Sequence, residues 1–311
     1  MKPRRIAIIG AGPVGGILAA HLCTAGHDVH LVDSWKEHIR QIDAHGLKII
    51  GNEEKLVHPA HLYASVSDLG DTAPEFIFIC TKACYLEIVL GGMSDRLKHS
   101  NTVFISAQNG LDTEKVIVKN IGAGHVLRAV ITFAGFPTGP GEIMETFFIP
   151  PSYVGWLDPK AEEPCREVAN LVTAAGLTME PTAEIQKLVW KKTILNTCTM
   201  AIAAVTGMNM QEQDEFPPTR MLIEDLLRES INTAAAYGYD YGEGFFESVM
   251  EFNRKAGPHR PSMLVDLDNG HPTEIDQLNG RIVYYGRKHC MPTPLNQVVT
   301  ALVHMLENKA K

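Results

Sequence analysis

The sequence lacks the features that mark several classes of protein. No apolar run reaches the roughly 18 residues that span a bilayer, and no signal peptide precedes the first strand-like segment. The six cysteines form no C-x-x-C pair, and most lie in apolar segments, which predicts buried free thiols in a reducing compartment. We therefore expect a cytoplasmic protein that does not attach to membranes.

Hydrolytic motifs are missing as well. The thirteen histidines include no H-E-x-x-H spacing, and no G-x-S-x-G elbow is present. This disfavours zinc hydrolysis and nucleophilic catalysis, and we expect no metal-binding residue. Excess basic charge is also absent, because the net charge is -8 and the pI is about 5.9. Nucleic acid is therefore not an expected partner.

The 311 residues form an ordinary globular composition, with 45% hydrophobic and 21% charged residues, and the length favours two domains. Apolar strand-like runs alternate with helical patterns in the first half. This predicts the α/β fold class, with an N-terminal Rossmann-type dinucleotide-binding domain over residues 1–181. Helical periodicity over 185–205, 219–237, 272–288 and 294–308 predicts a mainly α-helical C-terminal domain over residues 182–311, for substrate binding and dimerisation.

A glycine-rich motif, G-A-G-P-V-G, connects the first predicted strand (6–9) to the first predicted helix (14–25). In this position the glycines allow a tight turn, close approach of a pyrophosphate and close packing of the helix on the strand. The helix N-terminus then faces the anion. The motif predicts a dinucleotide site, whose residues are Gly10, Gly12, Pro13, Val14 and Gly15.

Asp33 closes the second predicted strand, about 20 residues after the glycines. A carboxylate there accepts hydrogen bonds from the adenosine ribose and repels a 2′-phosphate, which favours NAD, with NADP as the less favoured cofactor. Two alternatives stay open. Lys36 is near enough to neutralise a phosphate, and Asp33 could instead cap the next helix.

Lys192 and Asn196 recur at helical spacing with Ile185, Val189 and Met200, on the stripe that we expect to face protein. A partly desolvated lysine has a lowered pKa and can act as a general acid. In the alternative, the Lys192 side chain reaches solvent beside Lys191.

Other polar residues lie where an α/β fold binds ligands. Asn109, Gly110 and Lys82 follow predicted strands at the carboxyl edge of the sheet. Glu274 stands at the beginning of the predicted helix 272–288, where a carboxylate is commonly only a favourable charge.

Six segments occur in order along nearly the whole chain: G-A-G-P-V-G, C-T-K-A (80–83), Q-N-G-L (108–111), W-K-K-T-I-L-N (190–196), S-M-L-V-D (262–266) and P-T-E-I-D-Q-L-N-G (272–280). Together they resemble the ketopantoate reductase (2-dehydropantoate 2-reductase) family. The resemblance implies an oxidoreductase that transfers a hydride between a nicotinamide cofactor and a 2-oxo acid/2-hydroxy acid pair.

The same resemblance implies roles for particular residues. Lys192 is the catalytic lysine, and Glu274 is the carboxylate that contacts the cofactor or the reacting hydroxyl. Asn109 positions both cofactor and substrate, and Lys82 contacts the cofactor. Lys192 and Asn196 bind the substrate, and Ser262 holds its carboxylate.

Two residues depart from the family pattern. Met200 stands where the family carries a second substrate-binding asparagine, which predicts a substrate without one of pantoate's polar groups. Asp33 stands where a basic residue usually takes NADPH. The chain is therefore expected to be a reductase of this family or a relative with changed cofactor and substrate.

Two other functions stay open. One is an NAD-dependent dehydrogenase of a different 2- or 3-hydroxy acid, since 3-hydroxy acid dehydrogenases share the Lys-x-x-x-Asn pair, although the T-E-I-D and Q-N-G segments argue against that family. The other is a non-catalytic dinucleotide-sensing protein, which would not need Lys192 and Glu274 to converge. The second domain is expected to form a homodimer.

Overall fold

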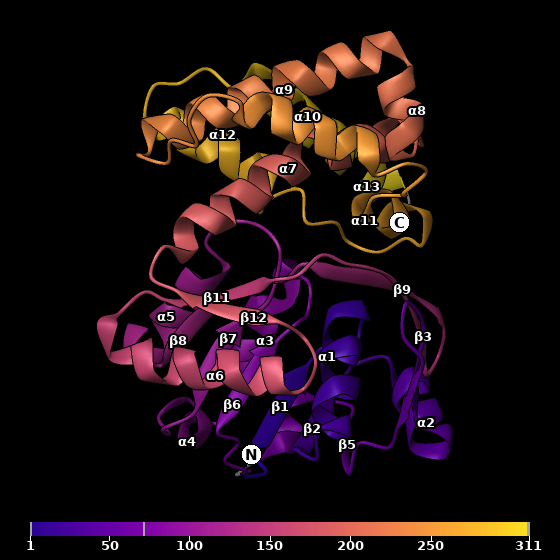
Figure 1. Ribbon diagram of the computed structural model, residues 1–311, viewed down its shortest axis with the longest axis vertical. Coiled ribbons are helices and arrows are strands. Elements are labelled where there is room, and N and C mark those ends of the chain that lie inside the picture. The colour runs from indigo at the N-terminus through magenta and orange to yellow at the C-terminus, as the bar shows by residue number, and fades with distance from the viewer. Residues whose placement is uncertain (1, 71, 310–311) are drawn as a thin grey trace. The chain divides into compact units, whose positions relative to one another are not determined.

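The computed structural model describes residues 2–70 and 72–309, and the chain divides into two compact units (Figure 1). The first unit contains the chain up to Gln108 together with Asp112–Ile185. The second contains Asn109–Leu111 together with the chain from Gln186 onward. The domain division between residues 181 and 182 stays a prediction, because compact packing alone does not establish units that fold independently.

An eight-stranded sheet forms the centre of the first unit, in the order β12-β11-β8-β7-β6-β1-β2-β5. Six neighbouring strands, in the order β5-β2-β1-β6-β7-β8, are parallel. This order is that of a Rossmann fold, so the predicted Rossmann-type sheet is confirmed. The strands are β1 (Arg5–Ile9), β2 (Asp28–Val32), β5 (His61–Tyr63), β6 (Phe76–Ile79), β7 (Val103–Ser106), β8 (Val126–Val130), β11 (Ser152–Trp156) and β12 (Met179–Thr182).

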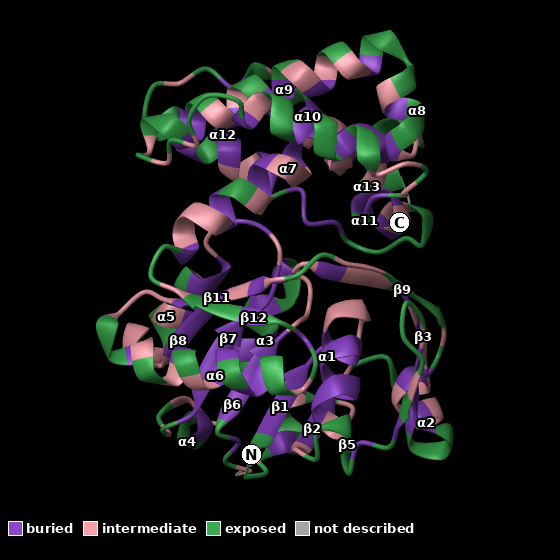
Figure 2. Cartoon of the chain, viewed as in Figure 1, coloured by how far each residue is buried: buried purple, intermediate pink, exposed green. Residues whose placement is uncertain are grey.

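The central strands of this sheet are buried on both faces, which explains their largely apolar sequences, whereas the outer strands β12 and β5 are partly exposed (Figure 2). Ile6 and Ile8 belong to one core with α1 and α6, whereas Ala7 and Ile9 belong to a second core with α3, α4 and α5. This is the alternation of a strand whose successive side chains point to opposite faces. The helices are α1 (Pro13–Thr24), α2 (Lys36–His45), α3 (Leu86–Gly92), α4 (Asp95–Lys98), α5 (Thr113–Ile121) and α6 (Glu162–Ala174).

A second sheet has the order β4-β3-β10-β9, and the sequence predicted only part of it. The antiparallel extension after residue 141 is confirmed, because β10 (Glu142–Phe148) pairs with β9 (Phe133–Gly139), and β11 pairs antiparallel with β8. The short strands β3 (Leu47–Gly51) and β4 (Lys55–Val57) were not predicted. They are only five and three residues long, and β3 completes its pairing with β10, far along the chain.

The second unit is helical, as predicted. Its helices are α7 (Ile185–Thr206), α8 (Met210–Glu215), α9 (Pro217–Ala236), α10 (Phe245–Lys255), α11 (Ser262–Asp268), α12 (Asn279–Lys288) and α13 (Pro294–Lys309). The predicted helix over 272–288 is wrong in its first half, because residues 274–278 form a bend and turns and α12 begins only at Asn279. Glu274 therefore does not lie at a helix N-terminus.

Two further observations concern the environment of the chain. Within residues 2–70 and 72–309, no helix combines the length and the apolar character that crossing a membrane requires. The six cysteines are free thiols, of which Cys165 and Cys198 are buried, whereas Cys84 and Cys290 are exposed. The free thiols agree with the sequence analysis, but burial holds for fewer of them than expected.

Candidate active site

The glycine-rich loop connects β1 to α1 as predicted, and its glycines meet different demands. A Cβ atom on Gly15 would stand 1.8 Å from the Gly10 carbonyl oxygen, so the protein itself requires glycine there. A Cβ atom on Gly12 would meet nothing within 4 Å. Gly12 is the N-cap of α1, no side chain caps this helix, and its first turn contains no acidic residue. The loop thus leaves open space and N–H groups for an anion.

Asp33 follows β2 and is bonded to this loop. Its Oδ2 accepts a hydrogen bond of 2.7 Å from the Ala11 N–H, and its Oδ1 accepts one of 2.8 Å from the Trp35 N–H. Helix α2 begins at Lys36 and has no side-chain cap. The alternative that Asp33 caps this helix is therefore wrong. A carboxylate has about four acceptor sites, so Asp33 can accept further hydrogen bonds.

His38 also holds the loop, and the sequence analysis did not identify it. The Gly141 N–H donates a 2.8 Å hydrogen bond to His38 Nδ1, so Nε2 carries the ring proton and donates to the Ala11 carbonyl at 3.1 Å. Burial lowers the pKa of His38 despite the opposing effects of Asp33 and the Ala11 carbonyl. The neutral ring thus joins the loop to residues just before β10.

Lys192, Asn196 and Met200 lie four residues apart on α7, and all three are partly buried. The stripe that packs completely passes through Thr193 and Thr197 instead. The Thr197 carbonyl, for example, accepts a 2.9 Å hydrogen bond from Asn279. Lys192 and Asn196, expected on the stripe that faces protein, therefore lie at the edge of the buried face of α7. Lys191 beside them is exposed.

Two motifs that are remote in sequence meet in the second unit. Asn109 Nδ2 donates a 3.1 Å hydrogen bond to Glu274 Oε2, and the Leu111 N–H donates one of 2.9 Å to the Gln277 carbonyl. Glu274 is only 9% exposed. Gly110 between them has φ +86°, and a Cβ atom there would stand 2.5 Å from the Gln277 carbonyl oxygen. Only glycine fits this close approach, which the sequence alone did not indicate.

The turn that carries Glu274 is held by α13. Glu307 Oε1 accepts hydrogen bonds from the N–H of Thr273 at 2.8 Å and from its hydroxyl at 2.7 Å. His304 contacts Glu307 through Nδ1 at 3.1 Å and Asp276 through Nε2 at 3.0 Å. Together with the hydrogen bonds that the Glu274 carbonyl accepts from the N–H groups of Gln277 and Leu278, both at 3.1 Å, these contacts hold residues 273–276 in a defined position.

Ser262, the first residue of α11, lies beside Met200. The Ser262 hydroxyl is 3.9 Å from the Met200 sulfur, at the distance of a weak hydrogen bond to sulfur. Ser262 is exposed and Met200 is partly buried. Ser262 and Met200 are therefore neighbours. The sequence connected both with the substrate, Ser262 because it matches the family pattern and Met200 because it departs from it.

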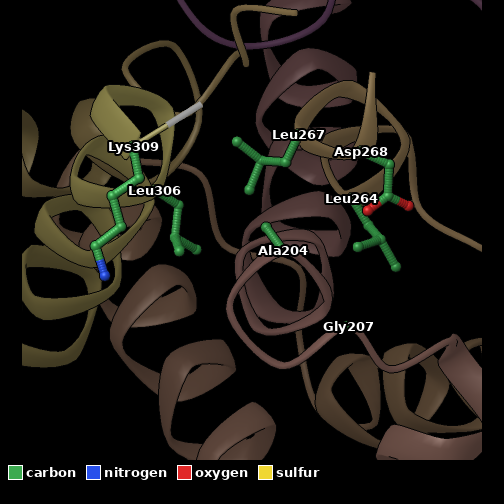
Figure 3. A pocket seen from close by; sticks show the side chains of 7 residues that line it. All are labelled: Ala204, Gly207, Leu264, Leu267, Asp268, Leu306 and Lys309. Carbon is green, nitrogen blue, oxygen red and sulfur yellow. The ribbon is translucent and has the colours of Figure 1, made fainter. Parts of the chain in front are cut away.

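A pocket of about 370 Å³ follows along the same elements (Figure 3). Ala204, one helical turn beyond Met200, and Leu264, two residues beyond Ser262, line it with Gly207, Leu267, Asp268, Leu306 and Lys309. None of the predicted site residues lines the pocket. Its lining combines four aliphatic side chains with the charged Asp268 and Lys309.

Lys82 lies in the first unit, where it follows β6 and is partly buried. It stands at the carboxyl edge of the sheet, as expected from its position in the chain. The first unit has an open glycine-rich loop with Asp33 beside it, and the second unit has Lys192 on a helix and the buried carboxylate of Glu274. This combination defines the chain as an oxidoreductase of the Rossmann type.

Comparison with known proteins identifies the family. The model described as ketopantoate reductase PanE/ApbA matches residues 6–155, and its C-terminal counterpart matches residues 184–307. The chain belongs to the ketopantoate reductase family. It is a ketopantoate-reductase-like, NAD(P)-dependent oxidoreductase that acts on CH–OH groups, which confirms the resemblance stated from the motifs.

Relatives match over their whole lengths. The 2-dehydropantoate 2-reductase of Lactococcus lactis is 27% identical, with 99% of each chain covered. That of Pyrococcus horikoshii is 26% identical, with 98% covered. A solved ternary structure of D-mandelate dehydrogenase with NADH and anilino(oxo)acetate has a TM-score of 0.88, is 25% identical and covers 98% of both chains. A ketopantoate reductase of Ralstonia eutropha, 24% identical with a TM-score of 0.88, shares the fold over 98% of this chain and 99% of its own.

Proposed function

We propose that this chain is an NAD-dependent reductase of a 2-oxo acid with an apolar side chain, in which Lys192 and Glu274 carry the proton chemistry. The observation that carries the proposal is the hydrogen bond between Asn109 and the buried Glu274. It brings a loop that follows a Rossmann strand to a carboxylate 165 residues later, which a protein that only binds dinucleotide would not need.

The dinucleotide fits the residues of the first unit. Gly10, Gly12, Pro13, Val14 and Gly15 would hold its pyrophosphate, since the space beside Gly12 is open and α1 presents N–H groups there. Asp33 would accept the ribose hydroxyls. Lys82 and Asn109 would contact the remaining parts of the dinucleotide. The bound nicotinamide supplies a hydride to the carbonyl carbon of the substrate.

Each side chain of the second unit then has a chemical task. The Lys192 ammonium would donate a proton to the carbonyl oxygen, and in reverse the neutral amine would take the hydroxyl proton. Asn196 would hydrogen-bond the substrate, and Ser262 would hold its carboxylate. Glu274, kept in place by Asn109, would accept a hydrogen bond from the hydroxyl or the cofactor. Asn109 would thereby align both reactants.

Asp33 supports NAD over NADP. Both of its carboxylate oxygens are already bonded to backbone N–H groups, so the carboxylate is fixed where it would meet the ribose. A 2′-phosphate would bring a second negative charge to this carboxylate. The solved D-mandelate dehydrogenase, which is bound to NADH, agrees with this preference.

Met200 supports a substrate other than ketopantoate. A thioether beside Ser262 offers an apolar surface where an amide would read a hydroxyl group. In the pocket beyond it, three leucine side chains add apolar surface beside the charged Asp268 and Lys309. D-mandelate dehydrogenase, whose structure contains anilino(oxo)acetate, has a ligand with an aromatic side chain. We therefore favour 2-oxo acids with branched or aromatic side chains.

Initial rates with NADH and NADPH test this proposal. We would measure absorbance at 340 nm with ketopantoate and with 2-oxo acids that bear branched or aromatic side chains, and in reverse with 2-hydroxy acids and NAD. We expect the highest kcat/KM with NADH and an apolar acid. A clear preference for ketopantoate would overturn the substrate proposal, and a preference for NADPH would overturn the cofactor proposal.

Lys192→Ala separates catalysis from sensing. We expect turnover to fall by at least about 100-fold, while the Kd for NADH, measured by fluorescence, stays within a few-fold of its original value. The exposed neighbour supplies the control, since Lys191→Ala should leave both quantities unchanged. Full activity in Lys192→Ala would exclude its role, and absence of turnover with every acid would favour the dinucleotide sensor.

We also propose a cytoplasmic homodimer. Three large apolar side chains on and between α8, α9 and α10 are exposed: Phe216 at 49%, Met221 at 66% and Phe252 at 44%. Such side chains are typical of an interface between copies. The free cysteines support a reducing compartment. Light scattering after size-exclusion chromatography tests the dimer, and a mass of about 34 kDa would contradict it.

A further inference from the structure

A second cluster of reactive side chains lies on the first unit, at the free edge of the eight-stranded sheet. Asp28 and His30 stand two residues apart on β2, so their side chains share one face. His61 begins β5 and pairs with His30 in the parallel register. The cluster is near the amino end of β2, whereas Asp33 and the glycine-rich loop follow the carboxyl ends of β2 and β1.

The distances in this cluster correspond to those around a tetrahedral ion. Asp28 Oδ1 lies 3.5 Å from His30 Nε2 and 3.4 Å from His61 Nε2, and all three atoms lie within 4.8 Å of one another. Zinc binds nitrogen and oxygen at about 2.0–2.2 Å, which places neighbouring ligands of a tetrahedral site about 3.3–3.6 Å apart. Two of the three edges already have this length.

His30 supplies an independent indication of a ligand. The residue is 3% exposed, and its buried Nε2 atom makes no hydrogen bond of good geometry, with the Asp28 carboxylate 3.5 Å away. Its Nδ1 is 2.9 Å from the Tyr63 hydroxyl, which can accept the ring proton. In the metal-bound form the Tyr63 hydroxyl would accept this proton, and Nε2 would offer its lone pair to the ion beside Asp28. Metal-binding histidines commonly have this arrangement, in which the second nitrogen donates to a fixed partner.

We propose that Asp28, His30 and His61 bind a divalent transition-metal ion, with Zn²⁺ as the best match and water in the fourth position. Two histidines and a carboxylate suit zinc, whereas Mg²⁺ and Ca²⁺ take oxygen ligands almost alone. Arg5 Nε contacts Asp28 Oδ2 at 3.0 Å and so leaves Oδ1 for the ion. The nearby guanidinium charge lowers the affinity below that of a closed structural site.

Binding requires one movement. The rings of His30 and His61 are stacked, with centroids 4.1 Å apart and planes 17° apart, so their lone pairs do not yet converge. His30 is held by Tyr63, whereas the His61 side chain is 46% exposed on a three-residue edge strand and has room to turn. An ion would thus join the short strand β5 to β2 and stabilise this edge of the sheet.

The full chain, freed of metal with a chelator and then titrated with Co²⁺, tests the proposal. Tetrahedral Co²⁺ gives strong visible absorption, which Zn²⁺ should abolish by displacement. We expect one equivalent to bind, and a hundredfold excess of Zn²⁺ over its Kd to raise Tm by roughly 5 °C. His61→Ala and Asp28→Asn should each remove the absorption and the Tm increase.

His45→Ala is the matched control, because His45 is an exposed histidine on α2 outside the cluster and should leave metal binding unchanged. Circular dichroism and the Kd for NADH verify that the first unit of each variant is folded. Absence of Co²⁺ binding, or binding that survives in folded His61→Ala, would overturn the proposal.

Discussion

Met200 is the residue whose side chain is expected to decide which acid the enzyme prefers. Its sulfur lies beside the Ser262 hydroxyl, so a group on the substrate near Ser262 meets a thioether. We expect Met200→Asn to move the ratio of kcat/KM values from apolar 2-oxo acids toward ketopantoate, by on the order of 100-fold. Met200→Leu, which keeps an apolar side chain, should leave the ratio nearly unchanged. An unchanged ratio in Met200→Asn would remove Met200 from the substrate site.

Glu274 is a buried carboxylate whose charge can be removed with little change in shape. Glu274→Gln keeps an oxygen that can accept the Asn109 hydrogen bond. We expect kcat/KM to fall by about 10²- to 10⁴-fold, because the lost group acts in the transition state. Thermal unfolding verifies the fold. A fall of less than a few-fold in a normally stable variant would make Glu274 a structural residue only.

Gly110 allows the loop and the turn to approach each other. We expect Gly110→Ala to destabilise the protein by about 1–3 kcal/mol, from backbone strain and from the clash with the Gln277 carbonyl. Gly270→Ala is the matched control, because Gly270 also has a positive φ, of +66°, but nothing lies within 4 Å of its Cβ position. Denaturant unfolding of both variants separates clash from strain. Equal losses would mean that strain alone acts.

Among the elements, α13 holds the turn that carries Glu274. Burial opposes the charged form of His304, but contacts with Glu307 and Asp276 outweigh it and raise the His304 pKa. We expect Glu307→Gln to lower kcat about 10-fold and to shift its pH profile, with the KM for NADH unchanged. Glu243→Gln, at an exposed glutamate, should change neither. An unaltered kcat and pH profile would show that Thr273 needs no such support.

The same turn marks the limit of what sequence periodicity predicted. Ile275, Leu278 and Ile282 have helical spacing, and all three are buried, but the first two lie before α12. Contacts from Glu307 and Leu111 help to hold this segment as turns before the regular helix begins, and no local pattern reports contacts from distant residues. The strands β1, β2, β6, β7 and β8 were predicted because both faces of each are buried and their sequences are largely apolar, interrupted only by polar residues such as His30 and Arg128.

The residues of the metal cluster show a similar limit. Asp28 and His30 alternate along one strand, but His61 joins them only through strand pairing that the sequence does not report. His38 was missed for the same reason, since its partners are Ala11 and Gly141. The glycine-rich motif and Asp33, by contrast, are neighbours in one βαβ unit, and their contact followed from known spacing.

For the molecule as a whole, His38 makes stability depend on pH. Its pKa is lowered in the folded chain, so below the unfolded value, about 6.5, the unfolded chain binds more protons and folding is penalised. We expect Tm to fall as the pH is lowered from 7.5 to 5.5. His38→Gln should reduce that dependence, and His45→Gln should not. His21, whose pKa burial also lowers, contributes a pH dependence to all three proteins. An equal pH dependence of Tm in all three would therefore show that His38 contributes nothing to it.

The hydrogen bond between Asn109 and Glu274 can form only late in the synthesis of the chain. Its partners are 165 residues apart, and ribosomes add about 5–20 residues per second, so Asn109 is synthesised roughly 8–33 s before Glu274. Throughout that interval the nascent chain can complete most of its parallel sheet, but the segment Asn109–Leu111 has none of its second-unit partners. Translation therefore finishes the catalytic constellation last, and chains that stall before residue 274 cannot assemble it.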